Sequence, residues 1–250
     1  MNISLVSPKS KTEVQDAYNF VKNILKFSED HPRSLDFYFS VFQKDPKYTV
    51  IAKNGNEIVG TIISSDENED TLLIGELAVN EKYRKLGIGT KLIQQLEQNA
   101  IEIGKKEITL GAQGPAENFY LKMGYTPRLF IQLTGNNRID EIIKYIPNKV
   151  VWENTGDGFS KVIVETNGVD KQLQKNISEK TGAHTQYLFS KRIVVSKNAK
   201  LKNLLYFYGS DNNFLSNSIV MLSLSIFFPK CSSLSLAVGE SFSVIMSFPS

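Results

Sequence analysis

The chain has little of what disulfides, zinc cages and histidine-based catalytic sites require. Its 250 residues include one cysteine, Cys231, and two histidines, His31 and His184. A single cysteine excludes an intramolecular disulfide and a cysteine-based zinc cage, and the two histidines show no ligand or triad spacing. We therefore expect no metal site, and the low cysteine content fits a reducing, cytoplasmic compartment.

Excess charge and long apolar runs are also scarce. The 29 Lys and Arg residues face 26 Asp and Glu residues, and the resulting net charge of +3 is too small and too evenly spread to predict nucleic-acid binding. Residues 1–9 lack the basic start and long apolar run of a secretory signal. The most apolar window of the carboxyl-terminal tail, 219–228, is shorter than the ~20 residues that span a bilayer. The sequence predicts a cytoplasmic protein with no membrane span and no nucleic-acid partner.

Apolar residues are plentiful, at 41% of the chain, and they suffice for a sizeable core. Strand periodicity alternates with helical periodicity, which predicts a mixed α/β fold. In the first half, the pattern predicts strands at 3–6, 48–53, 57–65, 72–79, 106–111 and 125–133. It predicts helices at 12–25, 33–44, 87–104 and 115–123.

The pattern restarts after Thr134. Helices predicted at 138–146 and 171–180, and strands at 150–153, 161–165 and 186–192, form a second cycle without a motif shared with the first. We expect a domain at 1–134, a smaller appended α/β module at 135–193 and an apolar, serine-rich tail at 194–250. The tail has three alternative explanations: buried strands that complete the module, an interaction patch, or a non-native reading-frame extension.

A buried strand at 72–79 runs into a glycine-spaced turn that opens a helix. The turn reads Arg84-Lys85-Leu86-Gly87-Ile88-Gly89-Thr90. Glycines there let backbone N–H groups and the positive helix end approach an anion, and the two basic side chains add charge. The spacing lacks the third glycine of a dinucleotide fingerprint and the Gly-Lys-Ser/Thr ending of a P-loop. The turn therefore predicts a phosphate site of another kind.

The segment from Val79 through Arg84-x-x-Gly87-x-Gly89 resembles the acyl-CoA motif of the GNAT superfamily of N-acetyltransferases. The later segment Ala116-x-x-x-Tyr120-x-x-x-Gly124-Tyr125 is similar to a second motif of that family, in which a tyrosine lies near the CoA sulfur. The resemblance covers roughly residues 1–133. Gln113 stands where the family often has asparagine, so the amide group is retained.

The resemblance implies a mixed central sheet of the acyl-CoA N-acyltransferase type. This sheet is splayed between the strands at 72–79 and 106–111, with pantetheine in the gap and acetyl-CoA as the acetyl donor. Backbone N–H groups near 77–79 are expected to stabilise the oxyanion. The predicted cofactor-binding residues are Leu77, Val79, Arg84, Lys85, Leu86, Gly87, Ile88, Gly89, Thr90, Gln113 and Ala116.

Two side chains are candidates for the catalytic proton transfers. Glu76 is the one carboxylate inside an apolar strand, where desolvation favours the protonated form and suits a general base. Alternatively, Glu76 binds a neighbouring donor or faces solvent, and a bulge would reverse the face on which it lies. Tyr120 is expected to protonate the leaving thiolate or to hold the sulfur, unless the Phe119-Tyr120 pair serves only packing.

The sequence thus predicts an acetyl-CoA-dependent N-acetyltransferase. The acetyl group passes to a primary amine, on a small molecule, by direct attack in a ternary complex. The alternatives are a catalytically silent CoA-binding regulatory module and a protein N-acetyltransferase; a homodimer formed through the tail is a further hypothesis. The acidic loop at 66–70 is expected to be solvated rather than to hold a cation, because it lacks the glycine and terminal glutamate of a calcium loop.

Overall fold

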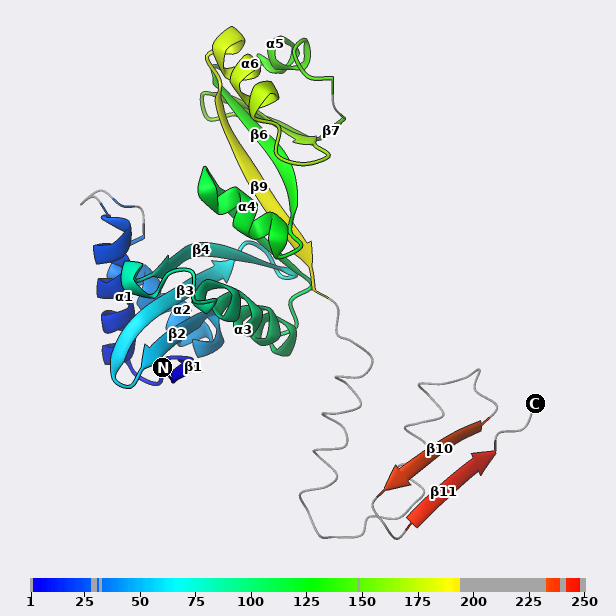
Figure 1. The fold of residues 1–250 in the computed structure, drawn as a ribbon. Helices are drawn as coiled ribbons and strands as arrows, with labels where there is room; N and C mark the ends of the chain where they lie inside the picture. Colours follow the sequence, from blue (N-terminus) through cyan, green and yellow to red (C-terminus); the bar gives the residue numbers. More distant parts are fainter. Residues whose placement is uncertain are drawn as a thin grey trace. The chain divides into compact units, whose positions relative to one another are not determined.

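The structure is a computed structural model that describes residues 2–27, 31, 33–147, 149–193, 233–238 and 242–247. Residues 1–195 form one compact unit and residues 196–250 form a second. In the first unit, nine strands build a single mixed sheet in the order β1-β2-β3-β4-β5-β9-β6-β8-β7 (Figure 1). The predicted mixed α/β fold with a central mixed sheet is confirmed.

The helices and strands of the first unit follow the predicted order closely. The strands are β1 (Ile3–Val6), β2 (Thr49–Asn54), β3 (Glu57–Asp66), β4 (Thr71–Val79), β5 (Glu107–Ala112), β6 (Thr126–Thr134), β7 (Val150–Gly156), β8 (Phe159–Glu165) and β9 (His184–Arg192). The helices are α1 (Lys11–Leu25), α2 (Leu35–Lys44), α3 (Ile88–Glu102), α4 (Pro115–Lys122), α5 (Ile139–Ile143) and α6 (Lys171–Thr181). Two short 3-10 turns are η1 (Pro46–Tyr48) and η2 (Glu81–Tyr83).

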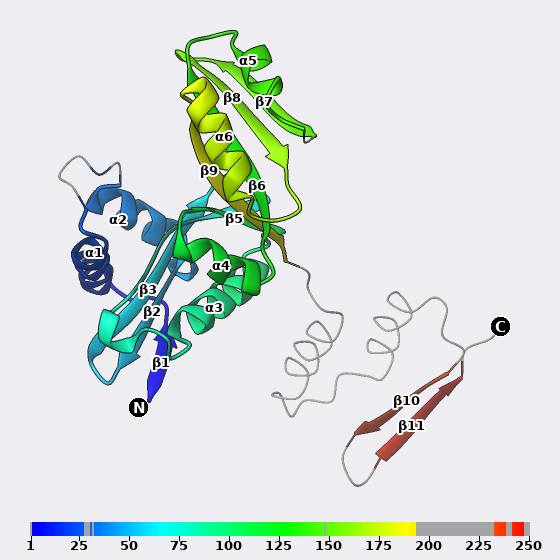
Figure 2. The same cartoon turned by 45° about the horizontal axis from the view of Figure 1, so that its top comes forward.

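Two cores lie on opposite faces of the sheet. Helices α1 and α2 cover one face of β3 and β4, where Val14, Val21 and Tyr38 pack with Ile63 and Ala78. Helix α3 covers the other face, and its apolar stripe joins the larger core that also reaches α5 and α6. Figure 2 shows α1 and α2 on one side of β2 and β3, with α3 on the other.

Strands β4 and β5 are parallel and pair over only part of their length. Their register runs from Thr71 opposite Glu107 to Ile74 opposite Leu110. Beyond Ile74, β4 continues to Val79 with β3 as its one paired neighbour in the described sheet. The two strands therefore separate at their carboxyl ends, which is the splay that the resemblance noted in the sequence implies.

A β-bulge sits where β4 leaves β5. Ile63 of β3 lies opposite Glu76, and the next residue, Ser64, lies opposite Ile74, so Gly75 is the extra residue. Ile74 packs in the core under α3, whereas Ala78 packs in the core under α1 and α2. Because the side chains of a strand alternate, the bulge turns Glu76 toward α1 and α2.

Strand β9 lies between β5 and β6 and is antiparallel to both. Residues 135–183, which precede it, build β7, β8, α5 and α6 at one edge of the same sheet. The predicted boundary at 134/135 therefore falls inside one compact unit, and residues 135–193 contribute a central strand. The periodicity of a sequence does not show that β9 belongs to the same sheet as β5 and β6, because it carries no information about which distant strands pair.

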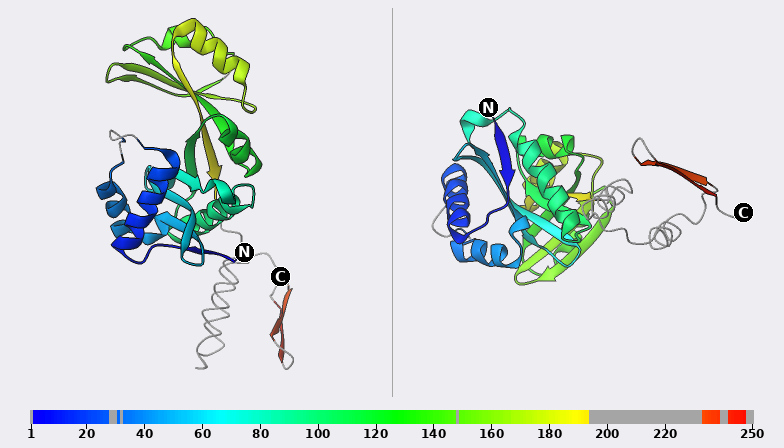
Figure 3. Two further views of the ribbon diagram at one scale, coloured as in Figure 1. Left: turned by 60° about the vertical axis from the view of Figure 1, so that its left-hand side comes forward. Right: turned by 90° about the horizontal axis from the view of Figure 1, so that it is seen from below.

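The second unit contains one described hairpin. Strands β10 (Ser233–Val238) and β11 (Phe242–Ser247) pair antiparallel, with Ser233 opposite Ser247 (red in Figure 3). The other residues of the predicted tail, including Cys231 and the window 219–228, lie outside the described residues. Within the ranges that the structure covers, no helix is both long enough and apolar enough to cross a membrane.

Candidate active site

The predicted phosphate turn joins β4 to α3 through η2 and residues 84–87. Its backbone takes left-handed conformations at Lys85 (φ +63°) and Gly87 (φ +78°). The Nε atom of Arg84 donates to the carbonyl oxygen of Val79 at 3.3 Å, and Nη1 of the same exposed guanidinium lies 3.9 Å from Oε1 of Glu81. No side chain caps the 15-residue helix α3. Its first N–H groups are thus available to an anion, as the sequence predicts.

Gly89 brings this turn against the second predicted motif. A Cβ atom at residue 89 would lie 3.4 Å from Cζ of Phe119 and 4.0 Å from Cγ2 of Val79. Phe119 belongs to α4 and directly precedes Tyr120. The structure therefore places the helix that carries Tyr120 beside the start of α3.

The remaining predicted cofactor residues lie on both sides of the strand separation. Leu77 and Val79 are half-buried against the core under α3, at the end of β4. Gln113 and Ala116 are exposed beyond the end of β5. Ile88 is buried in the core, so its backbone N–H, not its side chain, is the group that can face a ligand.

The other residues of the turn are accessible. Leu86 is exposed and Thr90 is half-buried in the first turn of α3. The sequence-predicted set is thus brought together around one end of β4, β5 and α3.

Tyr120 lies in an aromatic cluster and is only 6% exposed. Its ring centroid is 5.2 Å from that of Phe119, 5.8 Å from that of Tyr125 and 5.9 Å from that of Phe189. Burial raises the pKa of Tyr120 to about 12. The phenol therefore keeps its proton at neutral pH and is able to donate it or to form a hydrogen bond.

Glu76 is buried and forms an ion pair. Its side chain is 3% exposed, and its Oε1 accepts a hydrogen bond of 2.5 Å from Nη1 of Arg33. A Cβ atom at residue 75 would lie 2.6 Å from the same Nη1, so the glycine of the bulge gives the guanidinium its room. The alternative that Glu76 binds a neighbouring donor is thus observed. Arg33 is missing from the predicted site, because nothing in the local pattern links residues 43 positions apart.

The second oxygen of the same carboxylate is unbonded. Among the described residues, neither Oε2 of Glu76 nor the hydroxyl of Tyr38 has a hydrogen-bond partner, and both atoms are buried. Burial raises the pKa of Tyr38, and the negative charge of Glu76 raises it further. One carboxylate oxygen is therefore held by Arg33, and the Tyr38 hydroxyl is the other polar group near this carboxylate.

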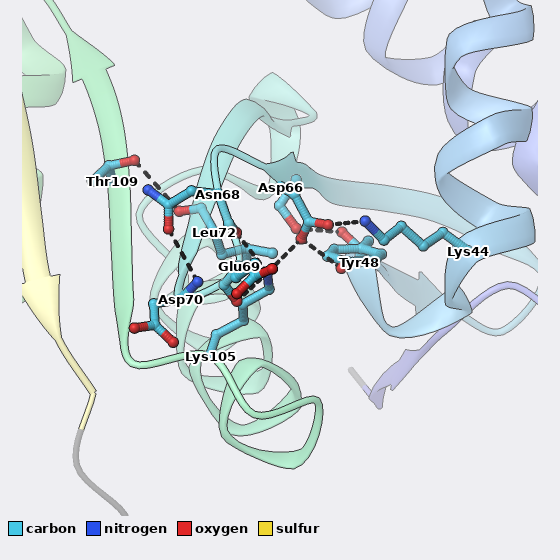
Figure 4. Close-up of polar contacts among 10 residues, drawn as sticks. Lys44, Tyr48, Asp66, Asn68, Glu69, Asp70, Leu72, Lys105 and Thr109 are labelled. Carbon is cyan, nitrogen blue, oxygen red and sulfur yellow. Dashed lines mark hydrogen bonds and ion pairs between the residues drawn. The ribbon is translucent and has the colours of Figure 1, made fainter.

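The acidic loop is organised around a buried lysine (Figure 4). The ammonium of Lys105 lies 2.7 Å from Oδ1 of Asp66 and donates to the carbonyl oxygens of Asn68 at 2.9 Å and Glu69 at 2.8 Å. Lys44 also pairs with Asp66. Because a side-chain ammonium already occupies this ring of oxygens, the loop is a structural clamp at the amino-terminal ends of β4 and β5, away from the predicted site.

One cavity of about 460 Å³ lies elsewhere, along residues 166–171 and Leu173. The same segment contacts α4, since Nζ of Lys171 lies 2.6 Å from Oε1 of the buried Glu117. None of the predicted site residues lines this cavity. The candidate site is therefore at the carboxyl ends of β4 and β5, where the predicted cofactor-binding and catalytic residues lie.

Solved structures of several acetyltransferases resemble the chain. Ard1 from Thermoplasma volcanium is 13% identical, with 78% of this chain and 100% of that chain covered and a TM-score of 0.48. The ribosomal-protein-S18-alanine N-acetyltransferase from Escherichia coli is 14% identical, with 79% and 98% covered and a TM-score of 0.46. Diaminobutyrate acetyltransferase EctA from Paenibacillus lautus is 14% identical, with 68% and 99% covered and a TM-score of 0.43.

A search of curated protein sequences finds no match. A family model does match residues 14–125, and its description is the acetyltransferase (GNAT) family. The matched range contains all the predicted cofactor-binding and catalytic residues. The match confirms the predicted family and, with it, acetyl-CoA as the acetyl donor. Residues 14–125 of this chain form an acetyltransferase domain of the GNAT family.

Proposed function

We propose that this chain transfers the acetyl group of acetyl-CoA to a primary amine of a small molecule, by direct attack in a ternary complex. The observation that carries the proposal is the uncapped start of α3, packed through Gly89 against the helix of Tyr120 and adjacent to the separated end of β4. In this proposal, the turn that binds phosphate and the tyrosine that donates a proton lie on the two sides of the separated ends of β4 and β5.

The donor is held mainly by backbone in this proposal. The N–H groups of residues 85–90 bind the pyrophosphate, and Arg84 and Lys85 supply positive charge. The end of β4 at Leu77 and Val79 lies along the pantetheine, with Gln113 and Ala116 across the strand separation. Backbone donors suit this role because they cost no reorganisation when the phosphates bind.

The chemical step joins the acceptor nitrogen to the acetyl carbon. A neutral amine attacks the carbonyl, N–H groups near 77–79 stabilise the oxyanion, and collapse of the tetrahedral intermediate breaks the carbon–sulfur bond. Glu76, directly or through water, takes the proton that the amine loses. Tyr120 gives its proton to the departing thiolate or holds the sulfur by a hydrogen bond.

Calorimetry with acetyl-CoA, followed by a free-thiol assay with a panel of amines, tests this proposal. We expect acetyl-CoA to bind and CoA to be released only when an amine is present. Binding without release for any amine or peptide would favour the regulatory module, and release with peptides alone would favour a protein N-acetyltransferase. Absence of binding would contradict the assigned site.

Tyr120→Phe is expected to lower kcat roughly 100-fold while leaving the Kd for acetyl-CoA within about twofold, because it removes one proton donor and keeps the ring packing. Steady-state kinetics and calorimetry measure the two quantities. Tyr125→Phe is the matched control, since it removes a buried hydroxyl from the neighbouring ring of the same cluster. Equal kcat values for Tyr120→Phe and the unmodified protein would restrict Tyr120 to packing.

Glu76→Gln is expected to remove the acidic limb of the pH dependence of kcat, because the amide keeps an oxygen for Arg33 but accepts no proton. The pH–rate profile is the measurement. Glu153→Gln serves as the control, since Glu153 is exposed on β7, away from the candidate site. An unaltered acidic limb in Glu76→Gln would assign proton removal to water or to another residue.

The location and the oligomeric state are part of the same proposal. We infer a cytoplasmic protein that is able to form a homodimer through its tail. Cell fractionation tests the location. Light scattering at several protein concentrations tests the dimer, using the full chain and a chain that ends before residue 212. A molecular mass of the full chain that does not rise with protein concentration would contradict the dimer.

A further inference from the structure

Arg33 lies directly before α2 and reaches across the bulge of β4. Its side chain is 27% exposed, and its guanidinium carbon lies 5.8 Å from the ring centroid of Phe37. The bulge at Gly75 and the bond to Glu76 fix the other side of the guanidinium. Arg33 is therefore a pre-oriented cation, which loses little side-chain freedom when it binds a ligand.

Most N–H groups of the Arg33 guanidinium make no hydrogen bond to the described residues. The guanidinium carries five N–H groups, and among the described residues one side-chain hydrogen bond is formed, from Nη1 to Glu76. Guanidinium groups bind carboxylates through two parallel hydrogen bonds. Arg33 is thus able to hold a carboxylate while its bond to Glu76 stays in place.

The ion pair lies next to the position of acetyl transfer. Glu76 directly precedes Leu77, the first of the residues whose N–H groups we assign to the oxyanion. Within the described part of the chain, the pair therefore presents a buried carboxylate, one oxygen of which is held by Arg33, and a partly exposed guanidinium whose other N–H groups contact no described acceptor. Two opposite charges side by side complement a ligand that carries an amine and a carboxylate close together.

We propose that Arg33 and Glu76 together bind the zwitterionic group of a free amino acid, with its carboxylate on Arg33 and its amine beside Glu76. This inference rests on the proposed function and names its acceptor class. Arg33 is then a specificity-determining residue. A peptide amino terminus is a poor acceptor in this arrangement, because an amide replaces the carboxylate next to the amine.

Matched acceptor pairs test the proposal. Each common L-amino acid is compared with its own carboxamide in the free-thiol assay, using the full chain. At least one amino acid should have a KM about tenfold or more below that of its carboxamide. Equal KM values within every pair, or better use of peptide amino termini than of free amino acids, would overturn the proposal.

Substitution of Arg33 tests the assigned residue. Arg33→Gln should raise the KM for the free amino acid about tenfold, leave that for the carboxamide within about twofold, and so abolish the preference. Arg33→Lys should retain part of the preference for the free amino acid, because lysine keeps the positive charge but lacks the two parallel N–H donors of the guanidinium. Arg138→Gln is the matched control, since it removes an arginine with an ion pair to Glu141 on the surface. An equal change for both acceptors in Arg33→Gln would overturn the role.

A binding measurement keeps the inference separate from the transferase proposal. The same amino acids and carboxamides are titrated calorimetrically into the protein, with and without CoA. If Arg33→Gln does not fold because Glu76 loses its partner, the Arg33→Gln/Glu76→Gln double variant replaces both charged side chains by neutral ones. This double variant still lacks the group that binds the carboxylate of the ligand. Selective amino-acid binding by the unmodified protein, lost in these variants, supports the inference even when no thiol is released. Equal binding of acid and carboxamide contradicts it even when acetyl transfer occurs.

Discussion

Gly89→Arg is expected to weaken acetyl-CoA binding at least 100-fold, which corresponds to about 2.7 kcal/mol or more of binding free energy. A Cβ atom at this position would already lie 3.4 Å from Cζ of Phe119. Arginine adds a long side chain beside Phe119 at the first turn of α3, where the N–H groups assigned to the pyrophosphate lie, and so fills the space that the proposal gives to the ligand. Calorimetry with acetyl-CoA measures the loss.

Two variants separate this effect from added charge and from loss of stability. Gln94→Arg adds the same charge to an exposed position of α3, and its affinity for acetyl-CoA should stay within about twofold of the unmodified value. Gly89→Ala adds only the Cβ atom and should lose much less affinity than Gly89→Arg. Thermal unfolding shows whether each variant is folded. Unchanged affinity in folded Gly89→Arg would reject the phosphate-binding turn.

Lys105→Met is expected to lower the free energy of unfolding by about 2–3 kcal/mol, because it removes a buried charged donor from two backbone carbonyl oxygens and from Asp66, which keeps Lys44 and Tyr48 as partners. The side chain of Lys105 is only 6% exposed, and its ammonium contacts Asp66 and two backbone carbonyl oxygens. Urea unfolding at neutral pH measures the change.

The adjacent lysine provides a matched control for this variant. Lys106 is 73% exposed and pairs with Asp70 at 2.9 Å on the surface. Lys106→Met should therefore cost less than about 1 kcal/mol, as exposed ion pairs do. Similar losses for Lys105→Met and Lys106→Met would show that the acidic loop is not clamped by the buried lysine.

The same clamp makes stability depend on acid pH. Burial alone would raise the pKa of Asp66, but hydrogen bonds from Lys105, Lys44 and Tyr48 outweigh burial and lower the pKa from 3.8 to about 2. The ionised carboxylate therefore stabilises the fold above about pH 4, and this contribution is lost as the pH falls toward about 2. Each pKa unit corresponds to about 1.4 kcal/mol, so the loss amounts to about 2 kcal/mol.

Urea unfolding at about pH 5 and about pH 2.5 measures this dependence. Asp66→Asn should show a smaller decrease between the two pH values than the unmodified chain, because it has no carboxyl group to protonate at residue 66. An equal decrease in both proteins would assign the acid sensitivity to other carboxylates.

Local features of this molecule were predictable from its sequence. The hairpin of β2 and β3 forms at the predicted positions, since Asn54-Gly55 supplies its own turn preference. The first two helices begin at Lys11 and Leu35, within two residues of the predicted starts at 12 and 33, although their caps, Ser10 and Ser34, were not predicted. The phosphate turn was likewise recognisable, because strand, glycine spacing and helix are contiguous in the chain.

Features that depend on distant pairing were not predictable. The bulge at Gly75 decides which core Glu76 faces, and it arises from the register of β4 against β3. The pairing of Arg33 with that carboxylate requires both the bulge and the path of the chain before α2. The periodicity within one segment predicts neither the bulge nor the path of the chain before α2, so the partner of Glu76 was not predictable from the sequence.

The insertion of β9 between β5 and β6 has a consequence for the order of folding. During synthesis, all the predicted donor-binding residues leave the ribosome before β9 does, yet Lys191 of β9 contacts Glu97 of α3 across 94 residues of chain. Until β9 arrives, β5 and β6 each expose an unpaired edge, and such long-range pairing is slow. A nascent chain stopped at residue 134 therefore contains the full donor motif but has an open sheet, vulnerable to aggregation until its last central strand is made.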